Sequence, residues 1–243
     1  MASASEFGAE MRRRLEQVEE HNAAALDAAA DLLLDRLVRR TGLLLTAGAG
    51  HSLIGVNEAF YRAGGLAPVR PLYLPELYPL HGAAASTAAE RTGGLAARVL
   101  ESAEPGPDDV LAVFSTSGVN PYPVELAIGA RERGLPVLAF TSRACNEAAP
   151  KRAGSTLGDE ADLVLDTLVR PGDVAYPDDR PVTAPMSTLA NAFLWNLLLA
   201  RLHERAAAEG ADLPLWRSSN FAGGDEANAD LFRRYADRVP ELG

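Results

Sequence analysis

Short apolar runs alternate with segments of helical periodicity along most of this chain. The runs are residues 43–46, 69–74, 110–114, 137–140 and 163–165. Each run is almost continuously apolar, as expected for strands that are covered on both faces of a sheet. Helical segments between strands are typical of crossover connections and therefore of parallel pairing. The pattern predicts an α/β fold: a five-stranded, doubly wound parallel sheet with helices on both faces.

Two longer helical patterns flank the predicted sheet. Residues 11–40 carry apolar side chains about every 3.6 residues, with no internal glycine or proline. Residues 187–208 are apolar on most sides, so we expect this helix to be covered twice, by the sheet and by a partner subunit. The chain is expected to divide into an N-terminal helix (1–42), the sheet domain (43–210) and a tail (211–243) with a short final helix capped by Asp225.

Charge and composition narrow the class of partner. The chain has 243 residues and a formal net charge of −10, with no basic stripe. This argues against binding to nucleic acid and to an anionic membrane. The one cysteine, Cys145, excludes an internal disulfide, and no apolar signal segment begins the sequence, so we expect a cytoplasmic protein. The apolar stretch 186–200 is short for a membrane span of about 20 residues.

Small polar residues and glycines follow three of the predicted strands. They form the segments TAGAGHS (46–52), STSG (115–118) and TS (141–142). The carboxyl ends of parallel strands lie at one edge of the sheet, where ligands bind near the reversal of strand order. The candidate ligand-binding residues are Gly50, Ser52, Ser115, Thr116, Ser117, Gly118, Asn120, Thr141 and Ser142.

The STSG segment has the features of an anion site. Asn120 can cap the following helix and Pro121 suits its first position, so free backbone N–H groups would face the ligand. The preceding hydroxyls add neutral donors, which suits a phosphate monoester and needs no lysine. A capped turn with incidental serines is the structural alternative.

Other phosphate and hydrolase motifs fit less well. Gly48-Ala49-Gly50 begins like a dinucleotide fingerprint, and Glu76 lies where a ribose-binding acid would be, but Leu53 replaces the third glycine. No Gly-Lys-Ser/Thr follows, which excludes a P-loop. STSGV also differs from the nucleophile motif of serine hydrolases.

The sequence resembles the sugar isomerase (SIS) domain in TAGAGHS, in VFSTSGVNPYPVELAIGARERGLPVLAFTS and in the spacing between them. The resemblance covers roughly Leu43 to Asp166 and extends to a stand-alone bacterial branch through HSLIGVNEAFYRAGGLAP and, more weakly, SNFAGGDEAN. It implies a phosphosugar ligand and a homodimer or higher homo-oligomer. It also implies phosphate binding by Ser115, Thr116, Ser117 and Asn120, with a further hydroxyl from Ser52. Asn120 stands where many relatives have Thr or Ser.

Isomerases and elimination enzymes of this family remove a proton beside a carbonyl, which needs a base near the strand ends. Glu58, on the helix that begins near Ser52, is the first candidate, although relatives carry this acid nearer Arg62. Glu90, on a helix expected from an N-cap at Ser86 to Glu101, is the second. The expected acid partner of Glu58 is either His51 in the glycine loop or Glu90. The four histidines lack metal-ligand spacing, so no metal and no cofactor is expected.

The implied reaction is aldose–ketose isomerisation of a sugar 6-phosphate, with an amino sugar fitting the resemblance best, or elimination from it. A phosphosugar sensor without turnover is the alternative. The first 40 residues form one predicted helix rather than a helix-turn-helix, which argues against a DNA-binding regulator.

Overall fold

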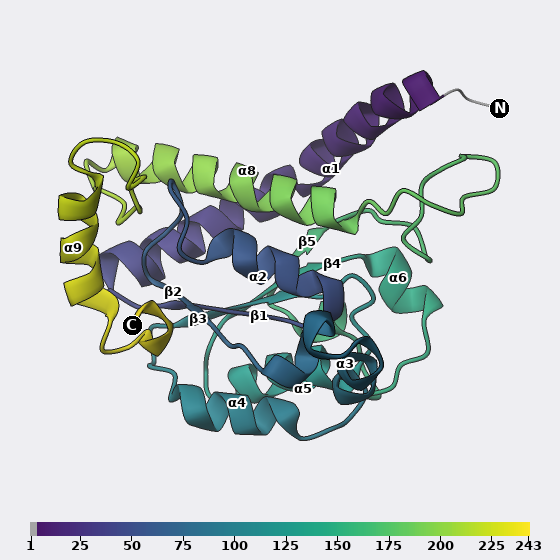
Figure 1. The fold of residues 1–243 in the computed structure, drawn as a ribbon, viewed down its shortest axis with the longest axis horizontal. Helices are drawn as coiled ribbons and strands as arrows, with labels where there is room; N and C mark the ends of the chain where they lie inside the picture. Colours follow the sequence, from purple (N-terminus) through teal and green to yellow (C-terminus); the bar gives the residue numbers. More distant parts are fainter. Residues whose placement is uncertain (1–3) are drawn as a thin grey trace.

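The computed structural model describes residues 4–243, and its centre is one sheet of five parallel strands. The strand order is β2-β1-β3-β4-β5, so chain order reverses between β1 and β3. The predicted fold class, a doubly wound α/β sheet, is confirmed (Figure 1). The strands are β1 (Leu44–Gly48), β2 (Val69–Pro71), β3 (Val110–Phe114), β4 (Val137–Thr141) and β5 (Leu163–Asp166).

Helices cover both faces of the sheet, which explains why the strands have no polar face (Figure 1). Every residue of β1, β3 and β4 is buried. One face carries α1 (Ala4–Leu33), α2 (Leu53–Ala59) and α8 (Ser187–Ala208); the other carries α3 (Ala83–Glu90), α4 (Leu95–Ala103) and α5 (Pro121–Glu132). The shorter helices are α6 (Arg143–Ala148), α7 (Leu157–Glu160) and α9 (Gly224–Tyr235).

A close approach between α2 and the sheet depends on one glycine. A Cβ atom at Gly55 would lie 2.5 Å from Cδ1 of Phe114. The Phe114 ring stacks on Phe140 at a centroid separation of 4.4 Å, and Phe140 in turn contacts Trp195 of α8. Gly55 therefore lets α2 lie directly on this aromatic layer of the core.

Three expected helices differ in detail. The helix expected at 11–40 begins earlier, at Ala4, and its last six residues, Leu34–Arg39, are π-helical. The helix expected from Ser86 to Glu101 is two helices, because the chain breaks at Gly94, where φ is +89°. Ser86 lies inside α3 rather than at its start, and its hydroxyl donates to the carbonyl of Leu77 at 2.8 Å.

The last of these differences concerns the start of the final helix. The N-cap of α9 is Gly223, which has a left-handed φ of +79°, and Asp225 lies in the first turn of the helix instead. A carboxylate in the first turn still interacts favourably with the helix dipole.

Buried polar groups attach both ends of the chain to the sheet. Asn22 of α1 donates from Nδ2 to the carbonyl of Asp166 at 2.8 Å and accepts from the Asp166 N–H at 2.7 Å. The Asn22 amide thus provides hydrogen-bond partners for the N–H and the carbonyl of Asp166 on the edge strand β5, as a neighbouring strand would. At the opposite end, the buried carboxylate of Asp109 accepts from the Leu43 N–H and from Arg238, which follows α9.

The outer surface of α8 keeps part of the apolar character that the sequence shows. Leu189 is exposed and Phe193 is half-buried, while Leu194 and Trp195 face the core. The expected pairing of two copies through this helix stays a prediction. Within residues 4–243, no helix combines the length and apolar character that crossing a bilayer requires.

Replacing Asn22 with Ala should destabilise the protein by about 1 to 3 kcal/mol, because both backbone groups of Asp166 would lose a buried partner. Urea unfolding followed by circular dichroism measures the change. The matched control is Gln17→Ala, an exposed position on the same helix. An Asn22→Ala protein as stable as this control would contradict the role given to the amide.

Candidate functional site

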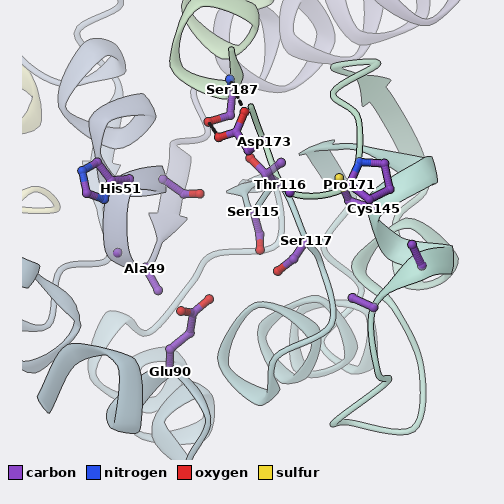
Figure 2. Close-up of a pocket in the computed structure, with 15 residues that line it drawn as sticks. Ala49, His51, Glu90, Ser115, Thr116, Ser117, Cys145, Pro171, Asp173 and Ser187 are labelled. Atoms are coloured by element: carbon purple, nitrogen blue, oxygen red, sulfur yellow. Dashed lines mark hydrogen bonds between the residues drawn. The ribbon is translucent and has the colours of Figure 1, made fainter. Parts of the chain in front are cut away.

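A cavity of about 510 Å³ opens at the carboxyl ends of β1 and β3, where the strand order reverses. One wall is the 3-10 turn η2 (Gly50–Ser52), which follows β1, and another is the segment after β3 (Figure 2). Loops that follow these two strands turn toward opposite faces of the sheet, which leaves a crevice between them. The cavity includes seven of the residues expected from the sequence: Gly50, His51, Ser52, Glu90, Ser115, Thr116 and Ser117.

Several hydroxyl groups line the cavity. Ser115 is largely buried, and its Oγ accepts from the Gly118 N–H at 3.2 Å. The hydroxyls of Ser52, Thr116 and Ser117 make no hydrogen bond to any residue in the described range 4–243. Three donors therefore line one cavity with their hydrogen-bonding capacity unused.

A buried network beneath the cavity holds the Ser115–Ser117 segment in place. Asn146 of α6 donates from Nδ2 to the Ser117 carbonyl at 2.9 Å and to Thr141 Oγ1 at 2.8 Å. Gly118 has a φ of +59°, and a Cβ there would lie 2.5 Å from Asn146 Nδ2. Glycine is therefore required on both counts: for the backbone conformation and for the approach of Asn146.

Four of the expected phosphate-binding residues lie behind the cavity wall. Gly118 and Thr141 belong to the network under the loop, and Thr141 is fully buried. Ser142 caps α6 through the Cys145 N–H and donates to the Val169 carbonyl at 2.6 Å. Asn120 occupies the N-cap of α5 but makes no side-chain cap; its Oδ1 accepts from Arg152 at 3.0 Å. These residues shape the loop without lining the cavity.

The candidate acids and bases separate into two places. Glu90, at the end of α3, points into the cavity toward the Ser115–Ser117 segment, and His51 lies on the η2 side (Figure 2). Glu90 makes no hydrogen bond or ion pair with another residue in the described part of the chain. Glu58, the first candidate base, does not line this cavity: it forms an ion pair with Arg62 and contacts Asn196 of α8.

Two other polar residues near the end of β2 do not line the cavity. His81 bonds to the Tyr73 hydroxyl at 3.0 Å, outside the cavity. Glu76, the candidate ribose-binding acid, pairs with Arg98. In the described range, no group of three or more His, Cys, Asp or Glu residues is arranged to hold a metal ion.

The loop between β5 and α8 supplies cavity residues that the sequence analysis did not identify. Asp173 and Ser187 line the cavity together, and Cys145 of α6 lies nearby in its wall (Figure 2). Asp173 accepts hydrogen bonds from the N–H groups of Met186 and Ser187, both at 3.0 Å. An aspartate in a Pro- and Asp-rich loop carries no local signal that it lines this cavity, since only the return of the chain over the sheet puts it there.

Fold and site together define the class of protein. Residues 6–142 match the model of the SIS domain, and the chain belongs to this family. The matched segment begins within the first turn of α1 and ends directly after β4.

Within the SIS proteins the chain belongs to the UPF0309 family. UPF0309 protein GK1441 of Geobacillus kaustophilus is 34% identical over 242 residues, covering 98% of this chain and 96% of that protein. UPF0309 protein SCO4393 of Streptomyces coelicolor is 37% identical over 231 residues, covering 93% of this chain and 92% of that protein.

Solved structures share the fold at lower identity. Phosphoheptose isomerase from Neisseria gonorrhoeae superposes with a TM-score of 0.54 at 20% identity, over 81% of this chain and 95% of that one. The phosphoheptose isomerase of Francisella tularensis gives a TM-score of 0.52 at 17% identity, over 84% of this chain and 100% of that one. At this identity the likeness concerns the fold.

Cys145 offers a direct probe of the cavity, because it is the one cysteine in the chain. Burial raises the pKa of its thiol, and the carboxylates of Asp173 and Asp166 raise it further. Alkylation requires the thiolate, so the rate for the folded protein should reach its half-maximum at a higher pH than the rate in urea. Iodoacetamide labelling followed by mass spectrometry measures both profiles, and Cys145→Ser is the blank. If the pH of half-maximal alkylation were the same in the folded and the urea-unfolded protein, or lower in the folded one, the raised pKa of the Cys145 thiol would be refuted.

Proposed function

We propose that the cavity binds a sugar phosphate, with the phosphate against Ser52, Thr116 and Ser117. The supporting observation is that the three hydroxyls line one cavity and have no partner in the described residues. None of the cavity residues is a lysine or arginine, so neutral donors would bind the anion. Hydrogen bonds to a charged acceptor are stronger than those between neutral groups, which makes such a site effective in an acidic protein.

The size of the cavity supports a ligand larger than phosphate alone. Its volume of about 510 Å³ falls within the usual range for small-molecule sites, about 300 to 1,000 Å³. A hexose 6-phosphate, with an amino sugar preferred, would fill it with the sugar beyond the Ser115–Ser117 segment. Membership of the SIS family adds weight to a phosphosugar over another phosphate ester.

For catalysis we propose Glu90 as the base and His51 as its acid partner. Glu90 would take the proton from the carbon beside the C1 carbonyl of the open-chain sugar, and His51 would protonate the carbonyl oxygen, giving an enediol. Return of a proton to C1, with loss of one from the oxygen on C2, gives the ketose. Expulsion of a substituent at C3 instead gives elimination. Glu90 points into the cavity and forms no ion pair with a residue of the range 4–243, which supports the choice (Figure 2).

A phosphosugar sensor without turnover is the second candidate. One observation favours it: His51 is exposed, and Glu90 has no hydrogen-bond partner in the described chain to orient its carboxylate. General acid–base catalysis requires positioned groups. In this case the ligand would stabilise the fold and change what the protein contacts, without being converted.

We also propose, as the sequence predicts, that the protein forms a homodimer. Leu189 on α8 and Ile54 on the neighbouring α2 are exposed apolar residues, and Glu58 lies on the same pair of helices. Pairing through this surface would bury them.

Ser117→Ala should weaken binding of hexose 6-phosphates by about tenfold or more, because one hydrogen bond to the charged phosphate is lost. Isothermal titration calorimetry measures the change in Kd. The matched control is Ser219→Ala, an exposed serine of the tail. Unchanged affinity for every phosphosugar in a panel would refute the assignment of the phosphate site.

Glu90→Gln should lower the rate of hydrogen exchange at C2 of the substrate by about 10²- to 10⁴-fold, the usual contribution of a general base. The protein is incubated with hexose and hexosamine 6-phosphates in deuterated water and the sugars are followed by NMR. Glu101→Gln, an exposed glutamate on α4, is the control. Ligand binding without exchange by the wild-type protein would favour the sensor.

A further inference from the structure

We infer that Asp173 is a specificity-determining residue, whose carboxylate accepts a hydrogen bond from a hydroxyl or amino group of the ligand. This inference rests on the proposed binding of a phosphosugar in the cavity. It assigns a direction to the ligand: the phosphate lies at the Ser115–Ser117 segment, and a donor group remote from the phosphate meets Asp173.

Hydrogen bonds to the start of α8 hold the Asp173 carboxylate in one orientation. Its Oδ1 accepts from the N–H groups of Met186 and Ser187, both at 3.0 Å, and its Oδ2 accepts from the Ser187 hydroxyl at 2.6 Å. The backbone of Asp173 has a φ of +51°, a conformation that few residues other than glycine adopt. A side chain held in this way is preorganised, so a ligand that uses it pays little to order it.

The carboxylate keeps one vacant acceptor position. A carboxylate has about four lone-pair sites, and the hydrogen bonds to Met186 and Ser187 occupy three of them. The remaining site is on Oδ2. Asp173 lines the cavity and forms no ion pair with a basic residue of the described chain. The group can therefore accept one more hydrogen bond, and the ligand is the available donor.

Charge decides which part of a phosphosugar lies at Asp173. The first N–H groups of α8 would attract an anion, but the Asp173 carboxylate already occupies them. A phosphate placed beside this carboxylate would be repelled, whereas the free hydroxyls of Thr116 and Ser117 carry no charge. In the view of Figure 2, Asp173 and Glu90 lie on opposite sides of the Ser115–Ser117 segment. A hydroxyl or a protonated amine is the complementary group for the Asp173 side.

The test compares Asp173→Asn with wild type, both full-length, by calorimetric titration with inorganic phosphate, hexose 6-phosphates and hexosamine 6-phosphates. We expect the variant to bind sugar phosphates about 10- to 100-fold more weakly, the effect of a hydrogen bond to a charged group, with little change for inorganic phosphate. A larger loss for the hexosamine would identify the donor as an amine; equal losses would identify a hydroxyl. The control is Asp178→Asn, the same change in the same loop at an exposed residue outside the cavity.

The outcomes separate the inference from the proposed function. If the wild type binds sugar phosphates and Asp173→Asn binds them equally well, the inference is overturned and the proposed function stands. The same holds if the variant binds sugar phosphates and inorganic phosphate more weakly by the same factor. Failure of the wild type to bind any phosphate compound would overturn both. If the variant does not fold, a crystal of the wild type soaked in the best ligand decides: the inference requires Asp173 Oδ2 within hydrogen-bond distance of a ligand donor, and phosphate at the start of α8 would overturn it.

Discussion

The reversal of strand order between β1 and β3 is the constraint on which the site depends. Crossovers between parallel strands are right-handed, so a chain that moves from β1 to β2 in one direction and from β3 to β4 in the other must place α2 and α5 on opposite faces. The two loops then separate above the sheet. The crevice between them holds the Gly50–Ser52 turn on one side and the Ser115–Ser117 segment on the other, and neither loop could form it alone.

The phosphate site proposed for this crevice is compatible with an acidic protein, because the interactions that would hold an anion there act over short distances. Charges on distant exposed side chains are screened over about 8 Å at physiological ionic strength. Hydroxyl groups within hydrogen-bond distance are not screened in this way, and the buried amide of Asn146 keeps the segment that carries two of them in position. The net charge of −10 therefore does not decide what the cavity binds. The carboxylates of Glu90 and Asp173 line the same cavity, on opposite sides of the Ser115–Ser117 segment in the view of Figure 2.

Local sequence patterns predicted the elements well wherever burial alone decides them. The continuous apolar runs identified all five strands, and the ends of β1 and β3 identified two of the segments that line the cavity. The predictions failed where two local signals compete. Ser86 is a residue type that often caps helices, yet its hydroxyl donates to the Leu77 carbonyl. Gly94 interrupts the helix that the apolar spacing predicted to continue to Glu101. The phosphate candidates Thr141 and Ser142 do lie at a strand end, but their hydroxyls have partners within the protein. Thr141 Oγ1 accepts from the Asn146 side chain, and the Ser142 hydroxyl donates to the Val169 carbonyl.

The sequence by itself determined the class of fold and one half of the site, because apolar periodicity and turn residues act over a few neighbouring positions. Only the tertiary structure decided which acids reach the cavity. Glu58 and Glu90 are both helical glutamates near a strand end, and the choice between them depends on how α2 and α3 are oriented over the sheet. Asp173 joins the site because α8 returns across the sheet and presents its first turn there. A contact between segments this far apart in the sequence produces no periodic pattern along the chain. It is therefore seen only in the folded molecule.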